Sequence, residues 1–257
     1  MNLLNSFPVF LLVLVRIAGF LVTMPIFSYR TIPGRVKIGL AVALSLLVDL
    51  TLFENQTVPL DTTYILLVMK ESLVGLSMGF IAGVLAYAVQ LAGSFIDLQM
   101  GFAIANTISP ENGITTPLTG QLLYIMQLLF FLGVNAHHML LSGLLDSFRL
   151  IPLDALTVPF SGGSAAEYAA RVTAQMFLIA LQLSMPIVGC LFLVDLAIGL
   201  VARTVPQVNV FVVGLPLKII VGFLIMLIAF PMFISLFRVI FESMTEILGH
   251  YMQLLGS

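Results

Sequence analysis

Residues 63–96 have the sequence TYILLVMKESLVGLSMGFIAGVLAYAVQLAGSFI, and this stretch decides the fold class. It is apolar on nearly every side, which is typical of a helix buried in a protein or a membrane. Its 34 residues would extend about 50 Å as one helix, whereas the hydrocarbon core of a bilayer is about 30 Å thick. Tilt accommodates only part of that excess. We therefore expect a helix that is bent, broken or only partly inside a bilayer.

Five further apolar stretches surround it, and breaker-rich turns separate them. They cover about 7–28, 36–53, 118–145, 168–201 and 211–241. Lipid-exposed backbone must satisfy its hydrogen bonds within each segment, which favours helices. The sequence therefore predicts an all-α, membrane-associated fold.

The composition excludes several classes of protein. Of 257 residues, 60% are apolar and 9% are charged, and the net charge is −2, whereas soluble domains carry roughly 25% charged residues. An ordinary soluble enzyme, a disordered chain and a nucleic-acid binder are all disfavoured. The single cysteine, Cys190, excludes a disulfide framework and a thiolate zinc site, and we expect it in the core.

Several charged residues interrupt the apolar stretches or lie at their edges. A charge at bilayer depth costs at least about 2.5–3.5 kcal/mol, so such side chains are expected to face a protein interior or a polar interface. Lys70 and Glu71 project about 100° apart on a helix, so we expect partners on other helices rather than a pair between them. The predicted buried charges are Arg16, Lys70, Glu71, Asp97 and Asp195, and Lys218 also falls in an apolar stretch.

Small residues and prolines supply the packing signals. Gly75, Gly79 and Gly83 share one helix face and allow close backbone approach. We assign that face to contact with another subunit, and packing within the chain remains the alternative. In the last third, bends or breaks are expected at four prolines, Pro186, Pro206, Pro216 and Pro231.

No arrangement of side chains points to catalysis or a cofactor. His137 and His138 are adjacent and point to different helix faces, so a structural pair is favoured over a metal site. The sequence has no nucleophile–base arrangement, phosphate loop or paired catalytic carboxylates. We predict that the protein is not an enzyme and needs no cofactor.

Three blocks of sequence together resemble one family. The first runs from Arg16 to Pro25 and continues over 32–41, and the second covers Glu71 to Gly79 and 92–103. The third, RTVPQVNVFVVGLPLK at 203–218, is the most specific. The chain resembles, over essentially its whole length, the R subunit of the flagellar type III export gate, called FliR, whose virulence-system counterpart is SctT.

The resemblance implies an architecture and a set of partners. The R subunit is similar to a fusion of the gate's P and Q subunits. Its helices form bent and broken apolar hairpins, and it completes a helical P–Q–R channel in the bacterial inner membrane at the flagellar basal body. The P-like portion would cover 1–165 and the Q-like hairpin 166–257. Other implied partners are the B-type switch subunit, the large A-type export subunit, the MS ring and unfolded flagellar proteins as substrates. The subunit-packing residues of the third block are Pro206, Gln207, Asn209, Phe211, Pro216 and Lys218.

The resemblance also implies a plug that blocks the resting channel. It corresponds by position to residues 101–120, called the plug segment below. Its expected sealing residues are Phe102, Ile104, Ile108, Pro110 and Pro117. Many relatives carry Asp-Pro where this chain has Ser109-Pro110, which puts an acidic role there in doubt. An ordinary loop between helices remains the alternative reading of this segment. A virulence-type gate and a small-solute transporter are the alternative functions.

Overall fold

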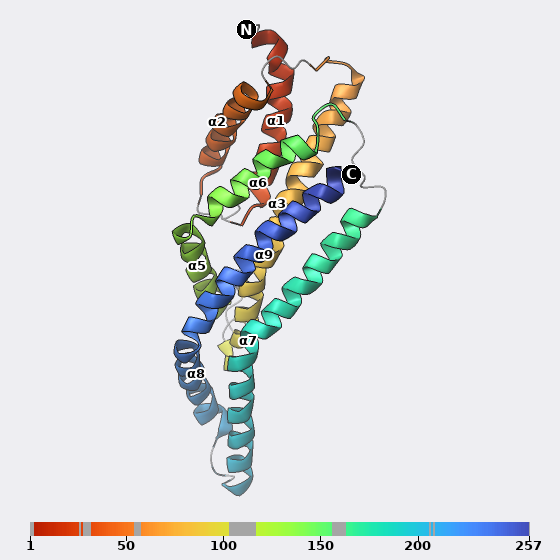
Figure 1. Cartoon of the computed structure of the whole chain (residues 1–257). Helices are drawn as coiled ribbons and strands as arrows, with labels where there is room; N and C mark the ends of the chain where they lie inside the picture. The colour runs from red at the N-terminus through yellow and green to blue at the C-terminus, as the bar shows by residue number, and fades with distance from the viewer. Residues whose placement is uncertain are drawn as a thin grey trace. The chain divides into compact units, whose positions relative to one another are not determined.

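The computed structural model describes residues 3–25, 27, 32–53, 58–102, 117–155, 163–205, 207 and 209–256. Every regular element within these ranges is a helix, so the all-α prediction is confirmed (Figure 1). The helices are α1 (Leu3–Thr23), α2 (Gly34–Leu52), α3 (Thr62–Met100), α5 (Leu118–Gly133), α6 (Ala136–Leu150), α7 (Ser164–Thr204), α8 (Val210–Ile228) and α9 (Phe230–Gly256).

Two of the predicted apolar stretches are divided, and the two longest are not. Helices α3 and α7 run over 39 and 41 residues. The stretch 118–145 is divided between α5 and α6, where Asn135 adopts the left-handed conformation with φ of 56°. Asparagine tolerates this conformation better than most residues, which explains a helix break that no proline marks.

The prolines differ in their effect on the helices. Pro231 lies in the first turn of α9, after a break at Ala229, where its missing N–H removes no helical hydrogen bond. Pro186 and Pro216 lie inside α7 and α8, which continue past them, so neither proline breaks its helix. A bend at these two residues, the other expectation, stays a prediction. Pro206 lies outside the described residues.

The chain forms two compact units that interleave along the sequence. Unit 1 comprises 1–85, 135–173 and 241–257, and unit 2 comprises 86–134 and 174–240. Helices α3, α7 and α9 each contribute residues to both units. The division at residue 165 into P-like and Q-like portions rests on resemblance and stays a prediction.

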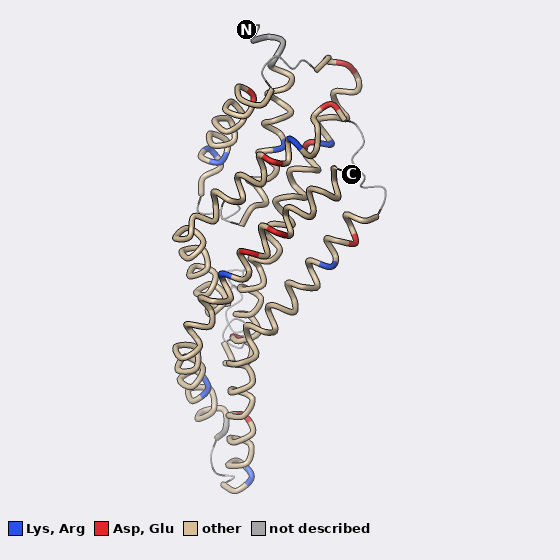
Figure 2. Tube along the Cα trace, in the orientation of Figure 1, with Lys and Arg blue, Asp and Glu red and all other residues tan. Residues whose placement is uncertain are grey.

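Three of the described helices are long and apolar enough to cross a membrane, and α5 with α6 could form a fourth, broken span. Long runs of the trace carry no charged residue (Figure 2). The most apolar window of α3 is 67% buried within the chain, but those of α7 and α8 are only 28% and 17% buried. Helices α7 and α8 therefore present large apolar surfaces to lipid or to other proteins.

Candidate functional site: a buried ion network and the ends of the plug segment

In unit 1, the glycine face of α3 packs against α1. A Cβ added to Gly75 would meet the backbone carbonyl of Arg16, and one added to Gly79 would lie 2.6 Å from the carbonyl oxygen of Phe20. A Cβ added to Gly83 would lie 3.2 Å from the carbonyl oxygen of Thr23. The predicted contact of this face with another subunit is therefore corrected, because α1 of the same chain occupies it. The close backbone approach that glycine allows serves the packing of α1 on α3.

This close approach brings Arg16 of α1 to Glu71 of α3. Its Nε and Nη2 donate to the Glu71 carboxylate, the latter at 2.9 Å. Nη1 donates to the carbonyl of Ser147 at 3.1 Å, and Nη2 also donates to the carbonyl of Ile151 at 2.9 Å. The guanidinium carbon lies 4.4 Å from the ring centroid of Phe148, and both charged side chains are fully buried. Arg16 thus has the partner on another helix that its burial requires.

Lys70 completes the network from α3. Its ammonium lies 2.8 Å from Glu71 Oε1, so the expectation that these neighbours do not pair is wrong. The flexible four-carbon stem of lysine lets the ammonium reach across the angle between adjacent helical positions. Lys70 also donates to three carbonyls that follow α6, those of Pro152 at 2.8 Å, Leu153 at 3.1 Å and Ala155 at 2.9 Å.

The network therefore holds α1, α3, α6 and the first residues after α6 together. It contains two cations, Arg16 and Lys70, and one carboxylate, Glu71, so backbone carbonyls satisfy the remaining donors. Such saturation is what keeps a buried ionic cluster from being strongly unfavourable.

In unit 2, Asp97 holds the end of the plug segment where α5 begins. Pro117 precedes α5 and offers no side-chain cap. The Asp97 carboxylate instead accepts the backbone N–H of Thr119 at 3.1 and 3.2 Å. A carboxylate at this position satisfies an unpaired N–H and complements the helix dipole.

Two glycines let α5 approach α3 at the same place. A Cβ on Gly93 would meet the backbone of Gly120. The Thr119 hydroxyl lies within hydrogen-bond distance of the Gly93 carbonyl, at 2.8 Å, and of Asp97. Asp97 is therefore a buried charge, as predicted, and its role is to fix the end of the plug segment on α3.

The other end of the plug segment lies against α8. Gly101 ends α3 with φ of 90°, and a Cβ there would lie 2.5 Å from Leu215 Cδ2. The Phe102 ring meets Phe223 edge-on, with the centroids 6.3 Å apart. Of the predicted sealing residues, Phe102 and Pro117 are thus at the two ends, whereas Ile104, Ile108 and Pro110 lie outside the described residues.

A second ion pair in unit 2 joins α7 to α8. Lys218 Nζ lies 2.9 Å from Asp195 Oδ1, and Gln99 of α3 donates to Asp195 Oδ2 at 2.9 Å. The Asp195 side chain is 40% exposed and that of Lys218 is 16% exposed. Asp195, predicted as a buried charge, does form an ion pair, but it is half-exposed rather than buried, because α7 is covered on few sides in this region.

The described residues of the third block are mostly exposed. Gln207, Asn209, Phe211 and Pro216 are exposed, and the Asn209 side chain accepts the N–H of Phe211 at 3.1 Å, capping α8. Their exposure leaves these side chains free to contact another subunit, and that role stays a prediction.

Some residues of these clusters escaped prediction. The sequence did not single out Thr119, Ser147 or Gly93, since a threonine or serine in an apolar helix carries no sign of its partner. One sequence signal could have pointed to Thr119: it lies two residues after Pro117, where a helix was expected to begin, and hydroxyl side chains often contribute hydrogen bonds at helix starts. Cys190 is exposed on α7 and not in the core as expected. Among the described residues, no group of three or more His, Cys, Asp or Glu side chains could hold a metal ion.

Residues 7–244 match the family described as bacterial export proteins, family 1. The chain is 46% identical over 255 residues to the flagellar biosynthetic protein FliR of Bacillus subtilis, covering 99% of this chain and 98% of the relative. It is 32% identical over 241 residues to FliR of Escherichia coli, covering 92% and 91%. It is 30% identical over 219 residues to the Yop proteins translocation protein T of Yersinia pestis, covering 84% of each. The chain therefore belongs to the FliR/SctT family of bacterial export proteins.

Proposed function

We propose that the chain is a core subunit of the flagellar type III export gate and helps to form the channel through which unfolded flagellar proteins leave the cell. The observation that carries this proposal is its 46% identity, along nearly the full length of both chains, to a flagellar biosynthetic protein. The lower identity to a Yop translocation protein, 30%, favours a flagellar over a virulence system.

The packing of the chain supports a role as one part of an assembly. Helix α8 carries strongly exposed apolar side chains at both of its ends, including Phe211 at 75%, Leu227 at 69% and Ile228 at 79% exposure. Together with the exposed apolar face of α7, this surface needs lipid or partner chains to cover it. The proposed partners are the P and Q subunits, with the B-type and A-type export subunits and the MS ring further out, in the inner membrane at the basal body.

The contacts at the two ends of the plug segment support a sealing role for it. One end is fixed by Asp97 and Thr119, and the other lies on Leu215 and Phe223 of α8. A segment anchored at both ends can reach into a channel without losing its place. In this proposal the work of the protein is conductance and sealing rather than catalysis.

Native mass spectrometry of the tagged chain, co-expressed with its genomic neighbours and purified in mild detergent, tests the assembly. We expect one large complex with one copy of this chain and several copies of two smaller partners. A monomer or homodimer that is indifferent to the neighbours contradicts the proposal. That result would favour the small-solute transporter.

Ion leak tests the seal. Replacing residues 103–116 with a Gly/Ser linker of equal length should raise ion flux through the purified complex in liposomes. The same replacement at 156–162, the connection between α6 and α7, is the control and should leave the flux low. Equal flux from both variants would show that the plug segment is an ordinary loop.

A further inference from the structure

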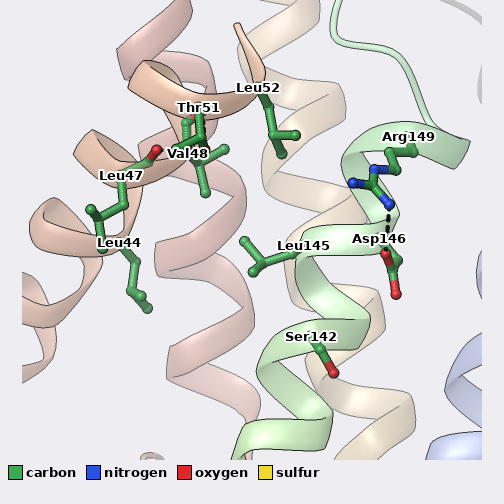
Figure 3. Close-up of a pocket in the computed structure, with 9 residues that line it drawn as sticks. All are labelled: Leu44, Leu47, Val48, Thr51, Leu52, Ser142, Leu145, Asp146 and Arg149. Carbon is green, nitrogen blue, oxygen red and sulfur yellow. Dashed lines mark hydrogen bonds and ion pairs between the residues drawn. The ribbon is translucent and has the colours of Figure 1, made fainter.

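A pocket lies between α2 and α6, both of which belong to unit 1 (Figure 3). Its volume is about 420 Å³, within the range of small-ligand pockets. Five residues of α2 between Leu44 and Leu52 and four of α6 between Ser142 and Arg149 line it. Leu47, Leu52 and Leu145 are 58%, 38% and 38% exposed, so the walls are apolar and incompletely covered.

Both charged residues that line this pocket belong to α6. Arg149 lies toward Leu52, and Asp146 lies farther along α6 toward Ser142, while the α2 side carries leucines (Figure 3). The Arg149 Nη1 and Asp146 Oδ1 atoms are 3.6 Å apart, and the two side chains are 73% and 59% exposed. A pair this long and this exposed is weak, so both groups keep hydrogen-bonding capacity for a ligand.

This arrangement matches an amphiphile with both charges in its headgroup. A guanidinium binds a phosphate through charge-assisted hydrogen bonds, and a carboxylate accepts hydrogen bonds from an ammonium group. An anionic headgroup without an ammonium could still place its phosphate at Arg149, but it would bring no positive charge to Asp146. A helix is about 10–12 Å across, so the pocket holds roughly one helical turn, which favours an acyl chain over a docked helix.

We propose that the pocket between α2 and α6 binds a phospholipid of the phosphatidylethanolamine type. Its phosphate lies at Arg149, its ammonium at Asp146, and one acyl chain runs along the leucines of α2. Binding of this kind places Asp146 and Arg149 at headgroup depth and so fixes unit 1 with respect to the bilayer surface. The proposal does not depend on the gate function.

The test is a lipid titration of the full chain, purified in mild detergent with the subunits that accompany it. Phosphatidylethanolamine or phosphatidylglycerol with identical acyl chains is added, and native mass spectrometry measures the fraction of the chain that retains one lipid. We expect about tenfold tighter retention of phosphatidylethanolamine, the size expected for one hydrogen bond to a charged group.

Variants locate the binding to this pocket. Arg149→Gln should weaken retention of phosphatidylethanolamine about tenfold, and Asp146→Asn should abolish the preference between the two headgroups. Leu47→Gln, at an exposed position that tolerates a polar side chain, should weaken retention of both lipids. The matched control is the pair Glu167 and Arg171 on α7, which is similarly exposed, at 66% and 73%, and lies outside the pocket. Glu167→Gln and Arg171→Gln should leave retention unchanged.

Two outcomes overturn the proposal. One is a lipid result against expectation: the unaltered chain retains phosphatidylglycerol as tightly as phosphatidylethanolamine or more tightly, or Arg149→Gln and Asp146→Asn leave retention of both lipids unchanged. The other is a protein occupant: in a Cys190→Ala background, a cysteine introduced by Leu47→Cys that cross-links to a neighbouring subunit or a second copy would show that protein covers the groove. In the absence of both, the lipid assignment stands.

Discussion

Two ion clusters, one in each unit, place the same chemistry in different surroundings. In unit 1, Arg16 and Glu71 are fully buried, and backbone carbonyls accept further hydrogen bonds from the guanidinium beside those that it donates to the carboxylate. In unit 2, Asp195 and Lys218 are 40% and 16% exposed. All partners of the first cluster come from this chain, whereas the second cluster is partly exposed and can be covered by lipid or by another subunit. The contribution of each cluster to the free energy of unfolding therefore depends on how deeply its charges are buried and on whether every donor has an acceptor, rather than on the presence of an ion pair.

Removing the Glu71 carboxylate from the buried cluster of unit 1 should have the largest effect on stability. Glu71→Gln leaves Arg16 and Lys70 buried without the carboxylate that pairs with both of them, and breaking a buried pair typically costs about 3–5 kcal/mol. We expect a large fall in the unfolding temperature of the purified chain and poor recovery of any complex.

The control for this prediction is Glu167→Gln, which breaks an exposed pair on α7. An exposed pair contributes about 0–1 kcal/mol, so this variant should behave almost as the unaltered chain does. If both variants unfold at the same temperature, the buried network does not stabilise unit 1.

Separating α1 from α3 should have the next largest effect, because it disturbs the same cluster through its backbone. Gly75→Ala places a methyl group against the Arg16 carbonyl, and overpacking costs about 1–3 kcal/mol. The control is Gly39→Ala in α2, where an added Cβ meets nothing within 4 Å. That change should stabilise the chain by about 0.4–1 kcal/mol. Thermal unfolding of both variants measures the difference, and a Gly75→Ala variant as stable as Gly39→Ala would contradict the observed helix contact.

Loss of the Asp97 cap should come third. Asp97→Ala leaves the Thr119 N–H without its acceptor, and losing a cap costs about 0.5–2 kcal/mol. Thr119→Val keeps that N–H and removes only the hydroxyl, so it should cost less. In the proposed gate, Asp97→Ala should also raise ion leak, because it releases one end of the plug segment. If Asp97→Ala lowers the unfolding temperature but does not raise ion leak, Asp97 stabilises the protein without being needed for the seal.

The sequence predicted the all-α class and the burial of most of the selected charged residues. It did not predict which residues pair with one another. Arg16, Glu71 and Asp97 were identifiable because a charge in an apolar stretch needs a partner. The pairing of Lys70 with Glu71 was not, since side-chain flexibility overrides the angular spacing of neighbouring positions. The glycines of α3 were recognised as a contact face, but helix spacing cannot tell a partner helix in the same chain from one in another.

Breaking the partly exposed ion pair of unit 2, Asp195 with Lys218, should have the smallest effect on the stability of the chain. Asp195→Asn removes the charge opposite Lys218, yet the carboxylate is 40% exposed, so the loss should stay below about 1 kcal/mol. Gln99 can still hydrogen-bond the remaining carbonyl oxygen of the new side chain, which reduces the loss further. The measurement is the unfolding temperature of the purified chain beside that of Glu71→Gln. A loss as large as that of Glu71→Gln would mean that Asp195 is covered in the purified protein. The exposed side chains of α8, Phe211 and Pro216 among them, would then be the first places to look for the covering subunit.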